Sequence, residues 1–532
     1  MRKLQIGIVD LVAKAPTKTM WGRVMGANFA SIMPQVVATW CEELGHNVAL
    51  VTYTGREDLL TELPNKPDLV FIGSFTEAAL LAYALSSLFR SKGAVTALGG
   101  PHARCYPQDA QKYFDYVLGF TDKALIQGIV GDCAQYRPHG LHLSAVRHPV
   151  QLPSVSERWK FIEQTLRKAP FIKIVPLLGS LGCPYTCDFC IDSSVPYQPL
   201  DADLIKQDLR FLLGKFRRPH VAWHDPNFGV RFDQCVDAIE EAVPPGSIDF
   251  IAESTLSLLS EKHVQRLKHN GFKALLPGIE SWFSMGKKSK TGRTVGIDKV
   301  RMVSDHVKMI LRYVPYVQTN HIVGLDSDKG PEPFELTKLF LDMTPGAFPA
   351  YSLLTAFGQA APVNLQYQRD NRVLPFPFHV LSNSQMNVRP RHYTWLELYD
   401  RLIDLTKHSF SRRMILRRFA ANGETIPKWL NVVRAFSSEG YGRIRYFTEI
   451  RRRLVVDRQF RRFFEQETSE TPPSLVQRIR KDLGGFWDWL PKGALRHDPN
   501  AYLLSQRSTG ASGTVPAANA RDEEDVIRRL SR

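Results

Sequence analysis

The sequence predicts an α/β protein in three parts: a doubly wound parallel sheet at the N-terminus, a partial (β/α)6 barrel of the TIM type, and a helical C-terminal domain. Three observations carry this prediction. Two stretches alternate short apolar runs with amphipathic helical patterns, and the chain is helical from about residue 390. The length of 532 residues exceeds what one core organises, at about 150 residues per domain. Hydrophobic residues at 44% and charged residues at 23% exclude a disordered or fibrous chain.

The first domain contains five predicted strands, at 4–9, 47–53, 68–74, 94–100 and 114–119. Helical patterns at 31–44 and 77–90 lie between them. Apolar strands separated by helices indicate a parallel sheet covered on both faces, and such a sheet binds ligands at the carboxyl ends of its strands. Residues 131–165 lack strong periodicity, so we interpret them as a linker.

A second βα alternation begins at Phe171. Its predicted strands are 171–178, 220–225, 248–254, 273–281, 316–324 and 350–357. Its predicted helices are 202–216, 234–243, 260–270, 297–311 and 334–343. Six repeats in about 190 residues fit a partial barrel better than a second doubly wound sheet. The active site of a barrel lies at the C-terminal ends of its strands. The predicted parts are therefore a sheet domain at 1–130, a linker at 131–165, a barrel at 166–385, a helical domain at 386–504 and a disordered tail at 505–532.

The net charge of +16 is concentrated in the helical domain. Residues 407–462 hold fifteen Lys or Arg against four Asp or Glu. Apolar residues alternate with arginine there at helical spacing, which favours an amphipathic helical cap with basic solvated faces. Peripheral membrane contact, an acidic substrate or carrier, and nucleic acid are the alternatives.

The sequence also indicates the compartment. Seven cysteines exclude a disulfide scaffold, and no apolar run reaches the roughly 18 residues that span a bilayer. The N-terminus superficially resembles a signal peptide, but Asp10 interrupts its apolar run and no small-residue cleavage site follows. We therefore expect a cytoplasmic protein.

The most informative motif is a cysteine cluster directly after the first barrel strand. Cys183, Cys187 and Cys190 are spaced by four and three residues, and Phe189 precedes the third. Three thiolates can ligate three irons of a 4Fe–4S cube and leave the fourth iron open. The open iron can chelate the amino and carboxylate groups of S-adenosylmethionine. A zinc site is the alternative, but zinc needs a fourth ligand at short spacing, and the next histidine downstream is His220.

These cysteines with Phe189 match the CxxxCxΦC motif of the radical S-adenosylmethionine superfamily. Together with the N-terminal sheet, the chain up to about residue 420 resembles the branch that carries a cobalamin-binding domain. Further local resemblances are Gly99-Gly100-Pro101-His102, residues 224–228, residues 278–281 and residues 320–324. The resemblance implies three cofactors: a 4Fe–4S cluster, S-adenosylmethionine and cobalamin.

Two features depart from the family pattern. The loop after Asp10 reads LVAKAPTKT, so it supplies no histidine as a lower axial ligand of cobalt. The acidic turn expected after the last strand of the sheet domain reads Gly119-Phe120-Thr121-Asp122. The prediction of cobalamin therefore depends on the order of the domains.

Several residues are candidates for cofactor binding. Glu280, at the end of the fourth barrel strand, can accept hydrogen bonds from a ribose diol or can be a rim residue. Weaker candidates toward S-adenosylmethionine or substrate are Phe189, Glu253, Ser254, Asn320, Ile322, Asp225 and Asn227. Gly99 and Gly100 permit close approach of a corrin, and His102 either lines that site or caps local backbone. No residue is assigned a catalytic role.

The resemblance implies an enzyme that forms a 5′-deoxyadenosyl radical and, with cobalamin, methylates an unactivated carbon of a small-molecule or lipid-like substrate. A flavodoxin or ferredoxin is the expected electron donor. The alternative within enzymes is a radical rearrangement, cyclisation or oxidation without methyl transfer. The alternative from another class is a basic nucleic-acid-binding protein with a structural or redox-sensing cluster, which the barrel context disfavours.

Overall fold

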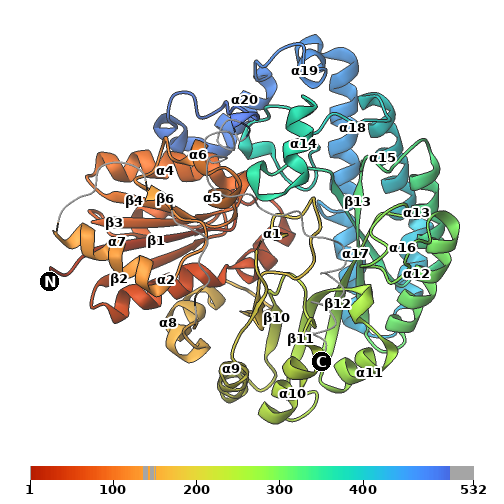
Figure 1. Cartoon of the computed structure of the whole chain (residues 1–532), viewed down its shortest axis with the longest axis horizontal. Helices are drawn as coiled ribbons and strands as arrows, with labels where there is room; N and C mark the ends of the chain where they lie inside the picture. Colours follow the sequence, from red (N-terminus) through yellow and green to blue (C-terminus); the bar gives the residue numbers. More distant parts are fainter. Residues whose placement is uncertain are drawn as a thin grey trace.

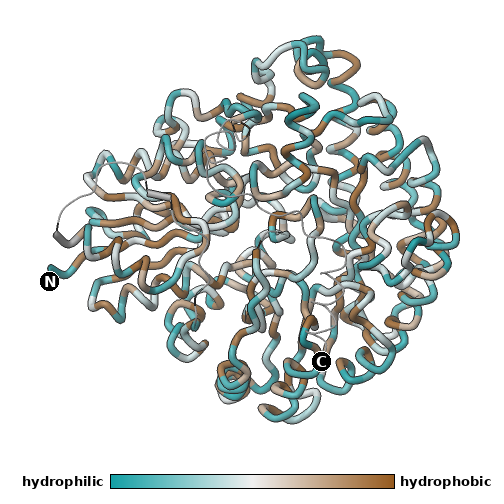
Figure 2. The backbone as a smooth tube through the Cα atoms, viewed as in Figure 1, coloured by the Kyte–Doolittle hydropathy of each residue, from teal (hydrophilic) through white to brown (hydrophobic). Residues whose placement is uncertain are grey.

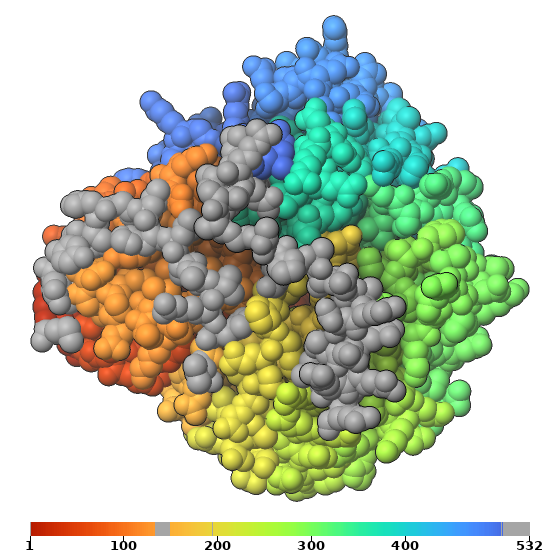
Figure 3. Space-filling view, in the orientation of Figure 1, coloured from red at the N-terminus to blue at the C-terminus, as the bar shows by residue number. Residues whose placement is uncertain are grey.

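The computed structural model describes residues 2–135, 142–143, 149, 151–193, 195–501 and 503. The N-terminal sheet domain lies beside the barrel, and the C-terminal helices border both (Figure 1). Figure 3 shows the same arrangement, with the last helices in blue along the upper edge next to the orange sheet domain. The predicted tail at 505–532 lies outside the described residues.

The N-terminal sheet has six parallel strands in the order β2-β1-β3-β4-β5-β6. Their bounds are β1 (Gln5–Leu11), β2 (Asn47–Tyr53), β3 (Leu69–Ser74), β4 (Val95–Gly99), β5 (Tyr116–Val117) and β6 (His142–Leu143). The first five confirm the predicted strands. Helices α2 (Ile32–Glu43) and α7 (Lys123–Gln135) pack on one face with Ile6 and Ile8, and α4 (Ala79–Ser91) packs on the other with Val9 and Leu11. The shorter connecting helices are α1 (Met20–Met25), η1 (Gly26–Phe29), α3 (Leu59–Glu62), η2 (Thr76–Ala78), α5 (Pro101–Cys105) and α6 (Pro107–Ala110).

The segment interpreted as a linker contains folded elements, which corrects that interpretation. Strand β6 and helix α8 (Val155–Leu166) lie within it. A capping box between Ser154 and Glu157 begins α8. Val155 and Ile162 of α8 pack into the barrel core, whereas Phe161 packs against the N-terminal sheet. The buried residues of α8 recur at helical spacing, so the sequence carries a pattern for this helix that the interpretation as a linker missed: they are Val155, Arg158, Phe161, Ile162, Thr165 and Leu166.

The barrel sheet is parallel and open, with the strand order β14-β13-β12-β11-β10-β7, so that β14 and β7 are its two edges. Its strands are β7 (Ile174–Leu177), β10 (His220–Trp223), β11 (Asp249–Thr255), β12 (Phe272–Glu280), β13 (Tyr316–Val323) and β14 (Phe348–Leu353). Its outer helices are α9 (Ala202–Lys215), α10 (Phe232–Ala242), α11 (Glu261–His269), α12 (Gly296–Leu311) and α13 (Glu332–Met343), with η3 (Leu256–Leu258) before α11. A short antiparallel pair, β8 (Ser180–Leu181) and β9 (Gln198–Pro199), flanks the cysteine loop. The six predicted strands and five predicted helices are confirmed, and Figure 2 shows the apolar residues concentrated along the strands.

The helical C-terminal part confirms the predicted class. Its elements are η4 (Gly358–Ala360), α14 (Val363–Arg369), η5 (Phe378–Val380), α15 (Trp395–Ser409), α16 (Arg412–Ala421), α17 (Thr425–Phe436), α18 (Tyr441–Val456), α19 (Arg458–Phe464), α20 (Pro473–Leu483) and η6 (Gly484–Trp489). One hydrophobic core joins α4 of the sheet domain, residues 351–388 and helices α15, α18, α19 and α20. The three parts are therefore packed together.

The arginine-rich segment is only partly a solvated face. Arg418 is 1% exposed and donates to the carbonyl oxygens of Ala347 and Ser409. Arg434 pairs with Glu439 and stacks 4.0 Å from the centroid of the Phe348 ring. Others form ion pairs: Arg417 with Asp342, Arg451 with Asp400, and Arg452 and Arg453 with Glu449. Part of the basic excess thus attaches the helical domain to the barrel. In the described part of the chain, no helix combines the length and the apolar character needed to cross a membrane.

Candidate active site

The cysteine loop lies at the C-terminal end of β7, where the barrel fold places active sites. Strands β8 and β9 pair on either side of it and bring its ends together. Gly182 has a φ of +69°, and a Cβ there would lie 2.2 Å from the Pro196 carbonyl oxygen. The Cys190 N–H donates to the Cys187 carbonyl oxygen at 3.0 Å. These contacts fix a compact loop that presents all three thiols.

Cys183, Cys187 and Cys190 are half-buried and influence one another electrostatically. Burial raises the pKa of each thiol, each is raised further by a neighbouring cysteine, and the Lys288 ammonium opposes these effects. Within the described ranges, no three His, Cys, Asp or Glu side chains form a site for one metal ion. A 4Fe–4S cube takes one thiolate on each of three irons, and the three thiols of this short loop match that number.

Lys288 and Glu280 face the cysteine loop. The Lys288 Nζ lies 3.1 Å from Glu280 Oε1 and 5.8 Å from the centroid of the Phe189 ring. Although burial lowers the pKa of Lys288, Glu280 and the cysteines raise it well above its usual value. Glu280 has a φ of +63°, and a Cβ on Gly278 would lie 2.3 Å from its Oε1. Gly278 therefore permits the position of the Glu280 carboxylate.

The remaining predicted residues on the barrel strands separate into two groups. Glu253, Asn320 and Ile322 occupy the less buried positions that alternate along β11 and β13 and face the barrel interior with Glu280. The Glu253 side chain is accessible to solvent. Desolvation by the surrounding protein raises the pKa of its carboxyl, and the negative charge of Glu280 raises it further. Asn320 donates to the Leu276 carbonyl oxygen at 3.4 Å. These side chains form one surface with Glu280.

Asp225, Asn227 and Ser254 are buried instead and form hydrogen bonds within the protein, so their contact with a ligand stays a prediction. Asp225 accepts from Gly179 N at 2.9 Å and Ser180 Oγ at 2.6 Å, and burial raises its pKa to about 6. The Asn227 side chain accepts from Thr255 N, and the Ser254 hydroxyl donates to the Phe228 carbonyl oxygen. They brace the start of the cysteine loop and the ends of β10 and β11.

A cavity of about 340 Å³ lies at the carboxyl ends of the N-terminal sheet. Gly99 and Gly100 line it from the end of β4, as predicted for a ligand of the sheet domain. Gly100 has a φ of +87°, and a Cβ there would lie 2.9 Å from the Ser74 backbone. A Cβ on Gly99 would meet nothing within 4 Å, so a flat ligand can approach the backbone there. Other lining residues include Asp10, Gly119, Phe120 and Thr121 from this domain and Leu178, Leu181 and His224 from the barrel.

His102 does not belong to this cavity, which corrects the prediction. It is fully buried, lies 2.8 Å from the Tyr83 hydroxyl, and packs against Tyr106 and Phe378. Burial lowers its pKa to about 3. Pro101 begins α5, and the first turn of that helix directs His102 toward α4 and η5.

Arg104 and Lys288 lie near the cysteine loop and have no counterpart in the sequence prediction. Arg104 of α5 forms an ion pair with Asp192 of the cysteine loop at 2.9 Å, and Asp192 N lies 3.4 Å from Cys190 Sγ. Lys288 is likewise missed, because it stands in a lysine-rich loop that matches no motif. Their distance along the chain from the cysteines left no signal to find them.

Comparison with known proteins identifies distant relatives. The chain is 21% identical over 365 residues to bacteriochlorophyllide d C-12(1)-methyltransferase of Chlorobaculum tepidum, covering 66% of this chain and 76% of that protein. It is 25% identical over 229 residues to the C-8(2)-methyltransferase of the same organism, covering 40% and 50%. No protein-family profile matches the chain.

Solved structures share the whole architecture. The radical S-adenosylmethionine methyltransferase TsrM from Kitasatospora setae, with cobalamin and a [4Fe-4S] cluster bound, superposes with a TM-score of 0.52 over 99% of both chains, at 14% identity. The cobalamin-dependent S-adenosylmethionine radical enzyme OxsB, with aqua-cobalamin bound, gives 0.53 over 99% of this chain and 84% of that chain, at 11% identity. The predicted family resemblance and fold are confirmed.

Proposed function

Because the chain has the fold of the cobalamin-dependent radical S-adenosylmethionine enzymes and carries their CxxxCxΦC loop, we propose that it methylates an unactivated carbon by radical chemistry. One observation carries the proposal. The three half-buried thiols lie beside Lys288 and Glu280 at the barrel mouth, and Arg104 and Asp192 join their loop to the ligand cavity of the N-terminal sheet. The two proposed cofactor sites would therefore adjoin each other.

The proposed roles follow from the contacts of each residue. Cys183, Cys187 and Cys190 would hold three irons of a 4Fe–4S cube and leave the fourth for S-adenosylmethionine. Glu280, with Glu253, Asn320 and Ile322 on the same surface, would orient the nucleoside end of that molecule. When bound, the cluster with S-adenosylmethionine supplies a 5′-deoxyadenosyl radical, and cobalamin supplies the methyl group.

The chain itself positions the reactants and excludes water. Lys288 holds a positive charge beside the thiols, which favours their deprotonated form for metal binding. The open backbone at Gly99 would let a corrin lie flat on the end of β4. We further propose a cytoplasmic location and a one-electron donor such as a flavodoxin or ferredoxin.

Anaerobic reconstitution tests the proposal. The protein is loaded with iron, sulfide and hydroxocobalamin, reduced, and incubated with cell extract and S-adenosylmethionine labelled in its methyl group. We expect 5′-deoxyadenosine together with a new labelled product in mass spectra. Formation of 5′-deoxyadenosine with an unlabelled product would favour radical rearrangement, cyclisation or oxidation instead.

A further inference from the structure

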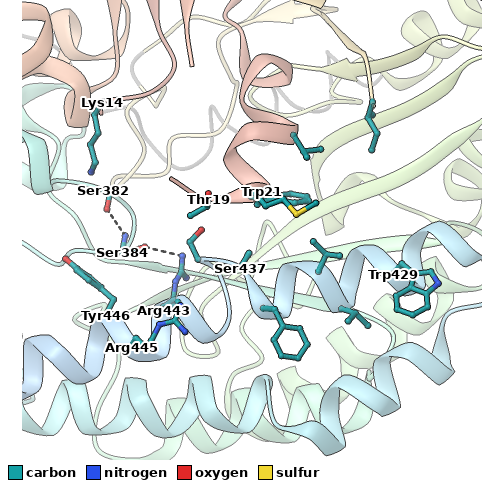
Figure 4. A pocket seen from close by; sticks show the side chains of 18 of the residues that line it. Lys14, Thr19, Trp21, Ser382, Ser384, Trp429, Ser437, Arg443, Arg445 and Tyr446 are labelled. Carbon is teal, nitrogen blue, oxygen red and sulfur yellow. Dashed lines mark hydrogen bonds between the residues drawn. The ribbon is translucent and has the colours of Figure 1, made fainter. Parts of the chain in front are cut away.

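A large cavity shares no lining residue with the cysteine loop or with the cavity of the N-terminal sheet. It has a volume of about 920 Å³ and lies between α1, the segment 380–384, α17 and α18 (Figure 4). This volume suits a bound organic molecule, since such sites measure roughly 300–1,000 Å³.

The cavity lies on the open side of the partial barrel. Phe171 and Ile172, just before the edge strand β7, form one wall, and Asn28 of η1 donates to the Ile172 carbonyl oxygen at 2.9 Å. Arg443 forms the opposite wall and donates to the backbone of Tyr351 in the other edge strand, β14. The cavity therefore occupies the gap that the six-stranded barrel leaves between its edges.

Its walls are mainly apolar, and large apolar side chains are exposed on them: Met20 is 79% accessible, Phe171 77%, Phe436 63% and Trp429 58%. Trp21 and Trp429 are seen at the cavity in Figure 4. A contiguous exposed apolar surface of this kind marks a binding site in a folded protein.

All charged side chains that line the cavity are positive. Its lining contains Lys14, Arg443, Arg445 and Arg478 and no Asp or Glu. Lys14 pairs with Glu77 at 2.9 Å, and Arg478 lies 3.9 Å from Asp482. Arg443 donates to the neutral Ser384 hydroxyl and the Tyr351 carbonyl, while Glu439 is already engaged by Arg434. For the exposed Arg445, no ion pair is formed with any described residue.

We propose that this cavity binds a large apolar molecule that carries an anionic group, with its apolar body against Met20, Trp429 and Phe436 and its anion at Arg445 and Arg443. That this molecule is the substrate rests on the proposed function; its binding does not. An apolar wall that ends at arginine side chains fits this chemistry, because a guanidinium forms charge-assisted and often bidentate hydrogen bonds with anionic oxygens.

A pair of fluorescent probes that differ in one charge tests the proposal on the full chain. 1-Anilinonaphthalene-8-sulfonate and N-phenyl-1-naphthylamine share their rings, and only the first is an anion. We expect saturable binding of the sulfonate, weakened about tenfold by Arg445→Gln, while the neutral probe is unaffected by that change. Trp429→Ala should weaken both probes, and Phe436→Ala serves as a second wall variant. Arg452→Gln, on the same helix but outside the cavity, should change neither affinity.

Equal affinity of the parent and Arg445→Gln for the sulfonate would overturn the proposal. So would flotation of the protein with phosphatidylglycerol vesicles that is lost in Trp429→Ala and Arg445→Gln, because the surface would then be a membrane contact. The assay needs no S-adenosylmethionine. Failure of the proposed radical chemistry would instead appear as absent 5′-deoxyadenosine with probe binding intact.

Discussion

Arg104 and Asp192 form an ion pair of 2.9 Å that joins the N-terminal sheet domain to the cysteine loop. Both side chains are largely shielded, at 15% and 26% exposure, and Arg104 also stacks 4.4 Å from the centroid of the Phe120 ring. Asp192 follows the third cysteine by two residues, and its N–H points to Cys190 Sγ. The contact therefore sets the cysteine loop relative to the cavity at the end of the N-terminal sheet.

A double-mutant cycle on this pair should give a coupling energy of about 1 kcal/mol. Arg104→Gln, Asp192→Asn and the double variant are compared by urea unfolding. The exposed pair Arg301 with Asp298, at 62% and 68% exposure, is the control and should show coupling near zero. Equal coupling in the two pairs would mean that the first contributes nothing to domain packing.

The Glu280–Lys288 pair gives a prediction for S-adenosylmethionine binding. Glu280→Gln keeps an acceptor oxygen but loses the charge, so we expect affinity to weaken roughly 10- to 100-fold, at 1.4 kcal/mol per tenfold and ~1.5–3 kcal/mol per charge-assisted bond. Isothermal titration measures this. Lys288→Met removes the same ion pair but keeps the carboxylate, and at equal iron content it should retain more affinity than Glu280→Gln. If Glu280→Gln has normal iron content and an unchanged affinity for S-adenosylmethionine, Glu280 does not bind this molecule and is only a residue of the barrel rim.

Adjacent glycines offer a matched test of the corrin site. Gly100→Ala places a methyl group against the Ser74 backbone at a positive φ and should destabilise the domain by ~1–3 kcal/mol. Gly99→Ala enters open space and should leave the melting temperature unchanged. If a corrin lies on Gly99, this second variant should retain hydroxocobalamin about tenfold less well after gel filtration. Full retention by Gly99→Ala would move the corrin away from that backbone.

Asp10 predicts a pH-dependent stability. Burial raises its pKa from 3.8 to about 7, while the Ser31 N–H at 2.8 Å opposes the rise. A carboxyl whose folded pKa is raised favours the folded state only while protonated. The contribution of Asp10 to the free energy of unfolding is complete below pH 4 and is lost as the pH rises to 7. At 1.36 kcal/mol per pH unit, the total loss is ~4 kcal/mol. Urea unfolding of Asp10→Asn should lack that loss and exceed the parent in stability at pH 8. Parallel pH profiles of parent and variant would contradict this.

The sequence was sufficient for the features that depend on local pattern. The strands of both sheets are apolar runs with helices between them, so they could be predicted. The spacing of the three cysteines is a property of the sequence itself, so the cluster motif could be predicted as well. His102 was misplaced because a GGPH turn does not reveal that Tyr83 of a distant helix buries the ring. Lys288 and Arg104 were missed because their partners are set by tertiary packing. The cavity on the open side of the barrel is built from segments that lie far apart in the sequence, so no local pattern could predict it.

The most direct test of the central claim is the yield of 5′-deoxyadenosine from anaerobically purified protein in which Cys183, Cys187 and Cys190 are replaced together by Ala. The parent, and a Cys235→Ala control that changes a thiol outside the loop, should each carry one 4Fe–4S centre and form 5′-deoxyadenosine under reducing conditions. The triple variant should lose the iron and form none. Full iron content or undiminished 5′-deoxyadenosine in the triple variant would contradict the assignment of this loop as the radical-generating site.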